Sequence, residues 1–353
     1  MFLNGIGTAT PPARYTKLDC WEAFRGSDWF ERLSPRTRAL ARAVLLTENG
    51  MEARRLAVDS LAEVFRIDPD TLHRRFLDTA PELATRAGAA ALDNAGVNAQ
   101  DIDAIVVSTC TGYLCPGLSG YVIERLGLRP NTAAFDLVGQ GCAAAIPNMR
   151  LGQALIASRP DPSHVLSICV EVSSAAMYLD DDPGVLVSAC LFGDGAGAAV
   201  LSSVPSSGRR SIHWQDSESL LDPGQREALK FEQRRGLLRN VLTRPVPQLA
   251  AQYVAQVLET LLRRAQLDIS QIGAWIVHAG GRDVLLALQE RMGIPPHDLR
   301  FSAAVLREYG NLSSAFVYFV LQAALAGGAA GGQWWLGSFG AGFSCHGALL
   351  EVD

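Results

Sequence analysis

The sequence lacks the features that mark several classes of protein. Its 353 residues carry 31 Lys and Arg against 36 Asp and Glu, so the net charge is −5 and no excess of positive charge is present for binding nucleic acid or an anionic membrane. The seven cysteines are odd in number and form no CxxC pair, and the six histidines form no HxxxH pair. A disulfide framework and a metal site are therefore not indicated, and we expect a small substrate held by a local basic patch.

Two further absences concern membranes and export. Residues 1–5, MFLNG, contain no basic region followed by a long apolar run, so we expect no secretory signal and a cytoplasmic location. Residues 309–350 contain no Asp, Glu, Lys or Arg. The most apolar part, residues 315–330, runs into glycine pairs before reaching the roughly 20 apolar residues that a membrane span needs. We expect this segment to be buried in protein, with no membrane span.

What the sequence does contain is an internal repeat. Hydrophobic residues make up 48% of the chain, enough for a large core, and its length suggests about two structural units. Residues 91–107 resemble residues 261–277 in pattern, each predicting a helix, a short turn and a buried strand. The glycines that follow the next helices, Gly127 and Gly293, suit left-handed helix caps.

The repeat continues through later elements. Short apolar runs of strand length occur at residues 165–172 and 334–339, and each is followed by a glycine-rich turn and a closing strand. Apolar strands that alternate with helices indicate sheets covered on both faces. We therefore predict an α/β protein with a five-layer α/β/α/β/α fold built from two duplicated halves. Residues 1–210 form the first half with an added helical region over the first 80 residues, residues 211–353 form the second, and residues 203–246 contain the connection.

Residues 135–142, FDLVGQGC, carry the first candidate for chemistry. A strand that turns through glycines into a helix would place Cys142 at a helix N-terminus, where the thiolate is favoured and its pKa falls. The thiolate is the nucleophilic form of cysteine. The alternative is a small core cysteine beside the alanines that follow it.

Two other residues are candidate partners for Cys142. His278 follows the repeated strand, at the place that Ser108 takes in the first half, and strand ends are where α/β sheets build their sites. Asn311 lies in a polar turn that opens the uncharged segment. Either residue could equally be structural, His278 as an ordinary histidine and Asn311 as a helix cap.

Taken together, several strings resemble the type III polyketide synthases, the chalcone synthase-like branch of the thiolase superfamily. They are GC at 141–142, LFGDGA at 191–196, WIVHAGG at 275–281, YGNLSSA at 309–315 and SFGAG at 338–342. The likeness runs in order from about residue 90 to the end. Many members carry proline where this chain has Ala279 and Ala341, and neither position touches the expected chemistry.

The resemblance implies an acyltransferase with a Cys-His-Asn triad. Cys142 would carry an acyl starter from an acyl-CoA, and His278 and Asn311 would stabilise the enolate formed when malonyl-CoA loses carbon dioxide. Claisen condensation and cyclisation would give a resorcinol, pyrone or phloroglucinol-type product from a homodimer that needs no metal or redox cofactor. The rival is a ketoacyl synthase III, which condenses once onto an acyl carrier protein, but its His-Gln-Ala-Asn string is absent. An inactive thiolase-fold scaffold and a Cys-His hydrolase are weaker alternatives.

The resemblance also implies the surroundings of the triad. Phe192 matches one of two aromatic gate residues, and the second gate position falls near Asn240, with Phe231 upstream as the alternative. Arg32 and Arg36 fall on basic contacts of coenzyme A. The Cys115–Pro116 bond is expected to be cis, in a loop that reaches the partner subunit's cavity. The residues expected to line the cavity are Cys110, Thr111, Cys115, Ser173, Ala176, Ser313, Ser338 and Phe339, in addition to Phe192.

Overall fold

The computed structural model describes residues 1–159, 161, 163–206, 208 and 210–353. Its principal element is a nine-stranded sheet, accompanied by two small two-stranded sheets. The strands are β1 (Phe2–Ala9), β2 (Arg14–Thr16), β3 (Ala53–Arg55), β4 (Ile102–Ser108), β5 (Ala133–Leu137), β6 (His164–Glu171), β7 (Gly195–Ser202), β8 (Ile212–Leu221), β9 (Leu229–Arg234), β10 (Leu237–Leu242), β11 (Ile272–Val277), β12 (Gly332–Gly340) and β13 (Ser344–Val352).

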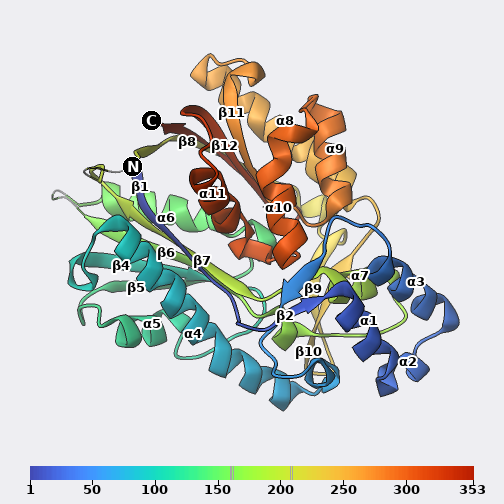
Figure 1. Cartoon of the computed structure of the whole chain (residues 1–353). Helices are drawn as coiled ribbons and strands as arrows, with labels where there is room; N and C mark the ends of the chain where they lie inside the picture. Colours follow the sequence, from blue (N-terminus) through green and yellow to red (C-terminus); the bar gives the residue numbers. More distant parts are fainter. Residues whose placement is uncertain (160, 162, 207, 209) are drawn as a thin grey trace.

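Helices cover the faces of this sheet and form a separate group near the N-terminus (Figure 1). They are α1 (Lys17–Arg25), α2 (Asp28–Arg32), α3 (Pro35–Leu46), α4 (Pro69–Ala95), α5 (Leu118–Leu126), α6 (Ala145–Ala157), α7 (Pro183–Leu191), α8 (Val246–Ala265), α9 (Arg282–Met292), α10 (Arg300–Tyr309) and α11 (Phe316–Ala326).

The large sheet has two parts that reflect the repeat. One part has the order β5-β4-β6-β7-β1 and the other has the order β8-β13-β12-β11. They join where β1 pairs with β8 through Phe2 and His213. In the first part α4 leads into β4, and in the second α8 leads into β11, as the repeat predicts. The predicted glycine caps are confirmed, because Gly127 and Gly293 have φ values of 65° and 66°.

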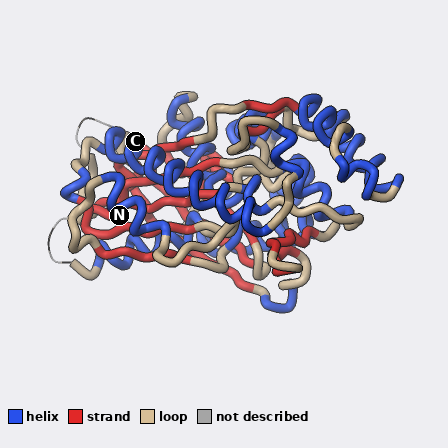
Figure 2. Tube along the Cα trace, turned by 90° about the horizontal axis from the view of Figure 1, so that it is seen from below, coloured by secondary structure: helices blue, strands red, loops and turns tan. Residues whose placement is uncertain are grey.

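The helices and the two parts of the sheet form the predicted layers. Helix α6 packs against β4 and β6 of the first part and β12 and β13 of the second, and α11 likewise contacts strands of both parts. These two helices are the middle layer, with α4 and α5 outside one part and α8 and α9 outside the other (Figure 1). Figure 2 shows the strands inside, with helices on both sides. The prediction of a five-layer α/β/α/β/α fold is confirmed.

The uncharged segment contributes helix α11 to this middle layer. Residues Phe316 to Leu321 of α11 are each at most 5% exposed, so the helix is surrounded by protein. A charged side chain there would lose its hydration without a partner, which explains why the segment contains none. Among the residues that the structure describes, no helix is long and apolar enough to cross a membrane.

Two expectations about organisation were wrong. The first residues are not part of a helical region, because β1 lies in the middle of the large sheet. Its Gly5 and Gly7 let the strand approach α4 so closely that a Cβ atom at either position would lie 2.2 Å from a backbone oxygen. In addition, the stretch expected to contain only the connection includes β8, which pairs with β13 along its length.

Candidate active site

Cys142 lies in a single 3₁₀ turn, Gly141–Ala143, directly before α6. Strand β12 holds this turn from the other half of the chain. Ser338 Oγ donates to the Ala143 carbonyl oxygen at 3.1 Å. Gly340 permits the close approach, because a Cβ there would lie 2.6 Å from the Ala143 nitrogen. Ser338, expected to line the cavity, is thus fully buried and anchors the turn that carries Cys142.

The expectation that the helix terminus lowers the pKa of Cys142 is wrong. Burial raises the pKa of the thiol to about 12. The hydrogen bond with Ser313, whose Oγ lies 3.2 Å from Cys142 Sγ, opposes this rise, and the nearby carboxylate Glu171 adds to it. The loss of water outweighs the helix terminus, so the thiol is neutral at neutral pH.

His278 follows β11 and is 1% exposed. Its backbone N–H donates to the Gly337 carbonyl oxygen at 2.9 Å, and its ring packs edge-on against Phe316 and at a tilt against Phe339. The buried Nδ1 has no partner among the residues described. Burial lowers the pKa of His278 to about 3, so the imidazole is neutral.

Asn311 is held by its own turn and by the segment that ends α7. Its backbone N–H donates to the Leu191 carbonyl oxygen at 2.9 Å, and Gly310 makes this approach possible, with φ +69° and no Cβ. The side chain is fixed at both ends, because Oδ1 accepts from the Ser313 N–H at 2.8 Å and Nδ2 donates to the Gly280 carbonyl oxygen at 3.2 Å. One amide hydrogen of Asn311 remains available for a ligand.

One cavity of about 690 Å³ brings the three candidate residues together. Phe192 and Phe339 also line it, as expected. Arg36 lies in its wall, whereas Arg32 lies in a separate surface hollow and stacks over Trp29. Two arginines that the sequence did not single out also line the cavity, Arg244 and Arg282.

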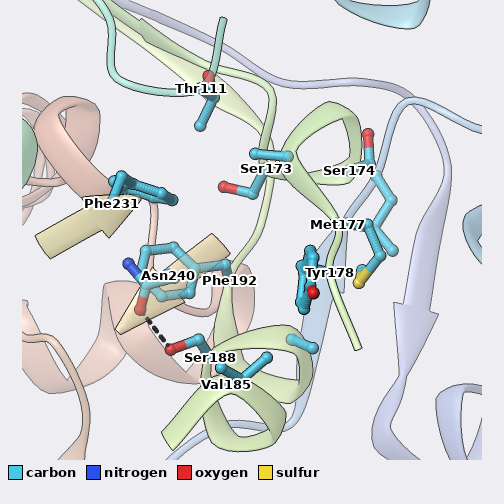
Figure 3. A pocket seen from close by; sticks show the side chains of 13 residues that line it. Thr111, Ser173, Ser174, Met177, Tyr178, Val185, Ser188, Phe192, Phe231 and Asn240 are labelled. Atoms are coloured by element: carbon cyan, nitrogen blue, oxygen red, sulfur yellow. Dashed lines mark hydrogen bonds between the residues drawn. The ribbon is translucent and has the colours of Figure 1, made fainter. Parts of the chain in front are cut away.

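A second, much smaller cavity of about 30 Å³ lies behind Phe192 (Figure 3). Thr111, Ser173 and Ala176 line it, as the resemblance implied. The cavity is small because larger side chains occupy the space. These are Met177, Tyr178, Phe192 and Phe231.

A buried carboxylate that the sequence reasoning missed lies beside the triad. Glu171 is inaccessible to solvent, and its pKa is raised by that burial. It accepts hydrogen bonds from Cys110 N–H at 3.1 Å and Thr111 Oγ1 at 3.0 Å, and its Oε1 lies 3.2 Å from Ser313 Oγ. It also accepts from Ser314. The sequence does contain one signal for this carboxylate, because Glu171 is an acidic residue near the end of the otherwise apolar run of residues 165–172.

The loop with Cys110 has mixed outcomes. Cys110, expected to line the cavity, lines neither of the two cavities described above and instead contacts Glu171. The Cys115–Pro116 bond is cis, as predicted. Cys115 itself is exposed and lines neither of the two cavities described above.

Comparisons with known proteins agree with this geometry. Residues 45–215 match the family model of the FAE1/Type III polyketide synthase-like proteins, and residues 218–351 match the C-terminal domain of chalcone and stilbene synthases. The 1,3,6,8-tetrahydroxynaphthalene synthase of Streptomyces peucetius subsp. caesius is 31% identical over 326 residues, covering 90% of this chain and 83% of that protein. The 3,5-dihydroxyphenylacetyl-CoA synthase of Streptomyces toyocaensis is 28% identical over 326 residues, covering 89% and 80%.

A solved structure extends the match to the whole fold. The crystal structure of 1,3,6,8-tetrahydroxynaphthalene synthase from Streptomyces coelicolor A3(2), a bacterial type III polyketide synthase, superposes with a TM-score of 0.89 at 26% identity and covers 99% of both chains. The fold and the matches define an acyltransferase of thiolase-like fold. Within that class, the chain belongs to the type III polyketide synthase family. This assignment favours a polyketide synthase over the ketoacyl synthase III alternative.

Proposed function

We propose that Cys142 carries an acyl starter and then the growing chain as thioesters, and that each cycle adds one unit from malonyl-CoA by decarboxylative Claisen condensation. The observation that carries this proposal is the shared cavity, which places a thiol, an imidazole and a carboxamide around one space with arginines in its wall. Each cycle breaks the bond between the malonyl methylene carbon and its carboxylate, and carbon dioxide leaves. The resulting enolate carbon bonds to the carbonyl carbon of the Cys142 thioester, and the Cys142 thiolate leaves. The lengthened chain, now a coenzyme A thioester, is transferred back to Cys142 and coenzyme A is released.

His278 and Asn311 stabilise the enolate oxygen in this mechanism. A buried imidazole whose pKa is about 3 stays neutral and can donate one N–H, and Asn311 has one free amide hydrogen. Both side chains are fixed by their neighbours, so little reorganisation is needed as charge develops.

Cys142 must still lose its proton before it attacks the starter. Burial disfavours the thiolate and the imidazolium separately, but a proton transferred from Cys142 to His278 creates two charges that attract each other in a dry cavity. Ser313 supplies a further hydrogen bond to the sulfur. We therefore assign the first proton transfer to this pair, on substrate binding.

The substrates enter through the large cavity. Arg36, Arg244 and Arg282 are suited to the phosphates of coenzyme A, which supports binding of acyl-CoA and malonyl-CoA. The proposed reaction uses no other cofactor. The product is a cyclised polyketide of resorcinol, pyrone or phloroglucinol type. The names of the two relatives, a tetrahydroxynaphthalene synthase and a dihydroxyphenylacetyl-CoA synthase, support an aromatic product.

The enzyme acts as a cytoplasmic homodimer in this proposal. Tyr113 is 70% exposed and Val138 is 64% exposed, so both side chains are available for contact with a partner subunit. Tyr113 lies on the loop that the resemblance implies reaches the partner subunit. Sedimentation of the purified chain tests the dimer, and a monomer at micromolar concentration would contradict it.

One assay tests the proposed reaction. The purified chain is incubated with malonyl-CoA and acetyl-, hexanoyl- or lauroyl-CoA, with no carrier protein, and products are identified by mass spectrometry. We expect free triketide or longer products. Products that form only when an acyl carrier protein is added would contradict the proposal.

A further inference from the structure

The two cavities share a wall of three residues, Ser188, Phe192 and Asn240, which line both. Phe192 is the apolar member of this wall. Asn240 occupies the place where the resemblance puts a second aromatic gate residue. The wall therefore has an apolar part, Phe192, and a polar part, Ser188 and Asn240.

The polar part of the wall is a hydrogen-bonded pair of side chains. Ser188 Oγ on α7 donates to Asn240 Oδ1 at 2.7 Å, and both residues are less than 10% exposed. Ser188 Oγ also lies 2.9 Å from the Gly184 carbonyl oxygen, but its single hydrogen is assigned to the shorter contact. With Oδ1 bound to Ser188, the amide nitrogen of Asn240 turns away from Ser188 (Figure 3). No described residue accepts a hydrogen bond from that nitrogen.

The position of Asn240 is fixed by its hairpin. Asn240 pairs across the β9–β10 hairpin with Phe231, which lines the small cavity. The adjacent Arg239 is buried and forms ion pairs with Asp180 at 2.8 Å and Asp182 at 3.1 Å. These pairs tie the hairpin to the segment before α7, so Asn240 and Ser188 are held together from both sides.

The small cavity, about 30 Å³, can hold little more than a water molecule. An elongating chain must therefore displace part of the wall to enter it. Such a chain carries a carbonyl on every second carbon, and a buried carbonyl needs a donor. Phe192 offers none, whereas the Asn240 amide offers two hydrogens.

We propose that Asn240 is a specificity-determining residue, whose amide nitrogen donates to a carbonyl oxygen of the Cys142-bound chain at the wall and so governs how many malonyl units are added. The inference rests on the proposed function, because it requires a chain on Cys142. Without the donor, a chain with several carbonyls leaves earlier as a shorter product.

Three variants test this role. Asn240→Leu removes the amide at similar size, Asn240→Asp keeps the shape but has no N–H, and Ser188→Ala leaves the donor but frees its orientation. Each is supplied with malonyl-CoA and hexanoyl-CoA, and the ratio of the longest product to shorter ones is measured. Acylation of Cys142 and the melting temperature are measured in parallel.

We expect both Asn240 variants to lower this ratio roughly three- to tenfold, the range expected for one lost hydrogen bond, when products are compared at equal acylation of Cys142. Ser188→Ala should shift the ratio in the same direction by less. An unchanged ratio in Asn240→Leu would overturn the inference, as would an effect of Asn240→Leu that Asn240→Asp lacks. If the wild-type chain forms no free ketide at all, the proposed function fails instead.

Discussion

Ser313 Oγ lies 3.2 Å from Cys142 Sγ and 3.2 Å from Glu171 Oε1. A hydroxyl has one hydrogen, so Ser313 can donate to the sulfur or to the carboxylate, but not to both at once. Its backbone N–H is held by Asn311 Oδ1 at 2.8 Å, which fixes its position. Ser313 is therefore placed to turn its hydrogen toward sulfur when the thiolate forms.

This relationship predicts the effect of Ser313→Ala. Loss of the hydrogen bond should raise the pKa of Cys142 further, and the rate of its alkylation by iodoacetamide at pH 9 should fall about tenfold, as for a hydrogen bond to a charged group. Peptide mass spectrometry reports alkylation at Cys142 alone. Ser158→Ala is the control, because that exposed hydroxyl donates to the Leu155 carbonyl oxygen of its own helix end. Equal rates in all three proteins would contradict the role of Ser313.

The buried His278 predicts a dependence of stability on pH. Its pKa is about 3 in the folded chain and 6.5 ordinarily, so between these values the unfolded chain binds more protons. The stability contributed by neutral His278 is complete above pH 6.5 and is lost as pH falls toward 3. Relative to His278→Gln, the wild-type chain should lose about 2 kcal/mol of unfolding free energy between pH 8 and pH 5. Urea unfolding measures this, and parallel profiles would contradict the burial of a neutral imidazole.

The close contact between Gly310 and the Leu191 carbonyl oxygen predicts what an added side chain would do to the turn that holds Asn311. An alanine there would adopt φ +69° and place its Cβ 2.5 Å from the Leu191 carbonyl oxygen. We expect Gly310→Ala to cost about 1 to 3 kcal/mol of unfolding free energy and to lower condensation activity. Gly120→Ala is the matched control, because nothing lies within 4 Å of its added Cβ in α5, and it should stabilise the chain by about 0.5 to 1 kcal/mol. If Gly310→Ala is as stable and active as the wild type, the backbone account is wrong.

The two proposed enolate donors predict a separation of loading from decarboxylation. His278→Ala should retain some acylation by acyl-CoA although it lacks the acceptor of the Cys142 proton, and Asn311→Ala should be acylated like the wild type. Both variants should decarboxylate malonyl-CoA about 100- to 1,000-fold more slowly. Release of carbon dioxide from malonyl-CoA is the measurement. Asn98→Ala, an exposed asparagine bonded to Asp101, controls for loss of a carboxamide. Decarboxylation at the wild-type rate in either triad variant would remove that residue from the mechanism.

Much of the architecture followed from local patterns in the sequence. The repeated helix–turn–strand units and the glycine caps at Gly127 and Gly293 are specified by residues that are neighbours in the sequence. The burial of α11 was predictable because its segment contains no charged residue. Strand β1 was missed because its two glycines are required by close contact with α4, and α4 is distant from them in sequence. Strand β8 was missed because its last seven residues, QDSESLL, include more polar side chains than a buried strand usually does.

The chemistry of the site was less accessible from the sequence. The three candidate residues were found by motif, and the structure places them around one cavity. The ionisation of Cys142 was not predictable, because burial of the thiol depends on contacts from three distant segments and outweighs the local helix terminus. Glu171 was assigned no role, and Asn240 was placed only near the second gate position, because each acquires its partner through tertiary contacts, with Ser313 and Ser188 respectively.

The central claim is that Cys142, among seven cysteines, carries the growing chain. The most direct test is to quench the enzyme during turnover with malonyl-CoA and hexanoyl-CoA and to map thioester masses by peptide mass spectrometry. The account predicts the starter acyl mass and its β-keto extensions on the Cys142 peptide, and no polyketide from Cys142→Ala. Thioesters on another cysteine such as Cys110, or undiminished product from Cys142→Ala, would contradict it.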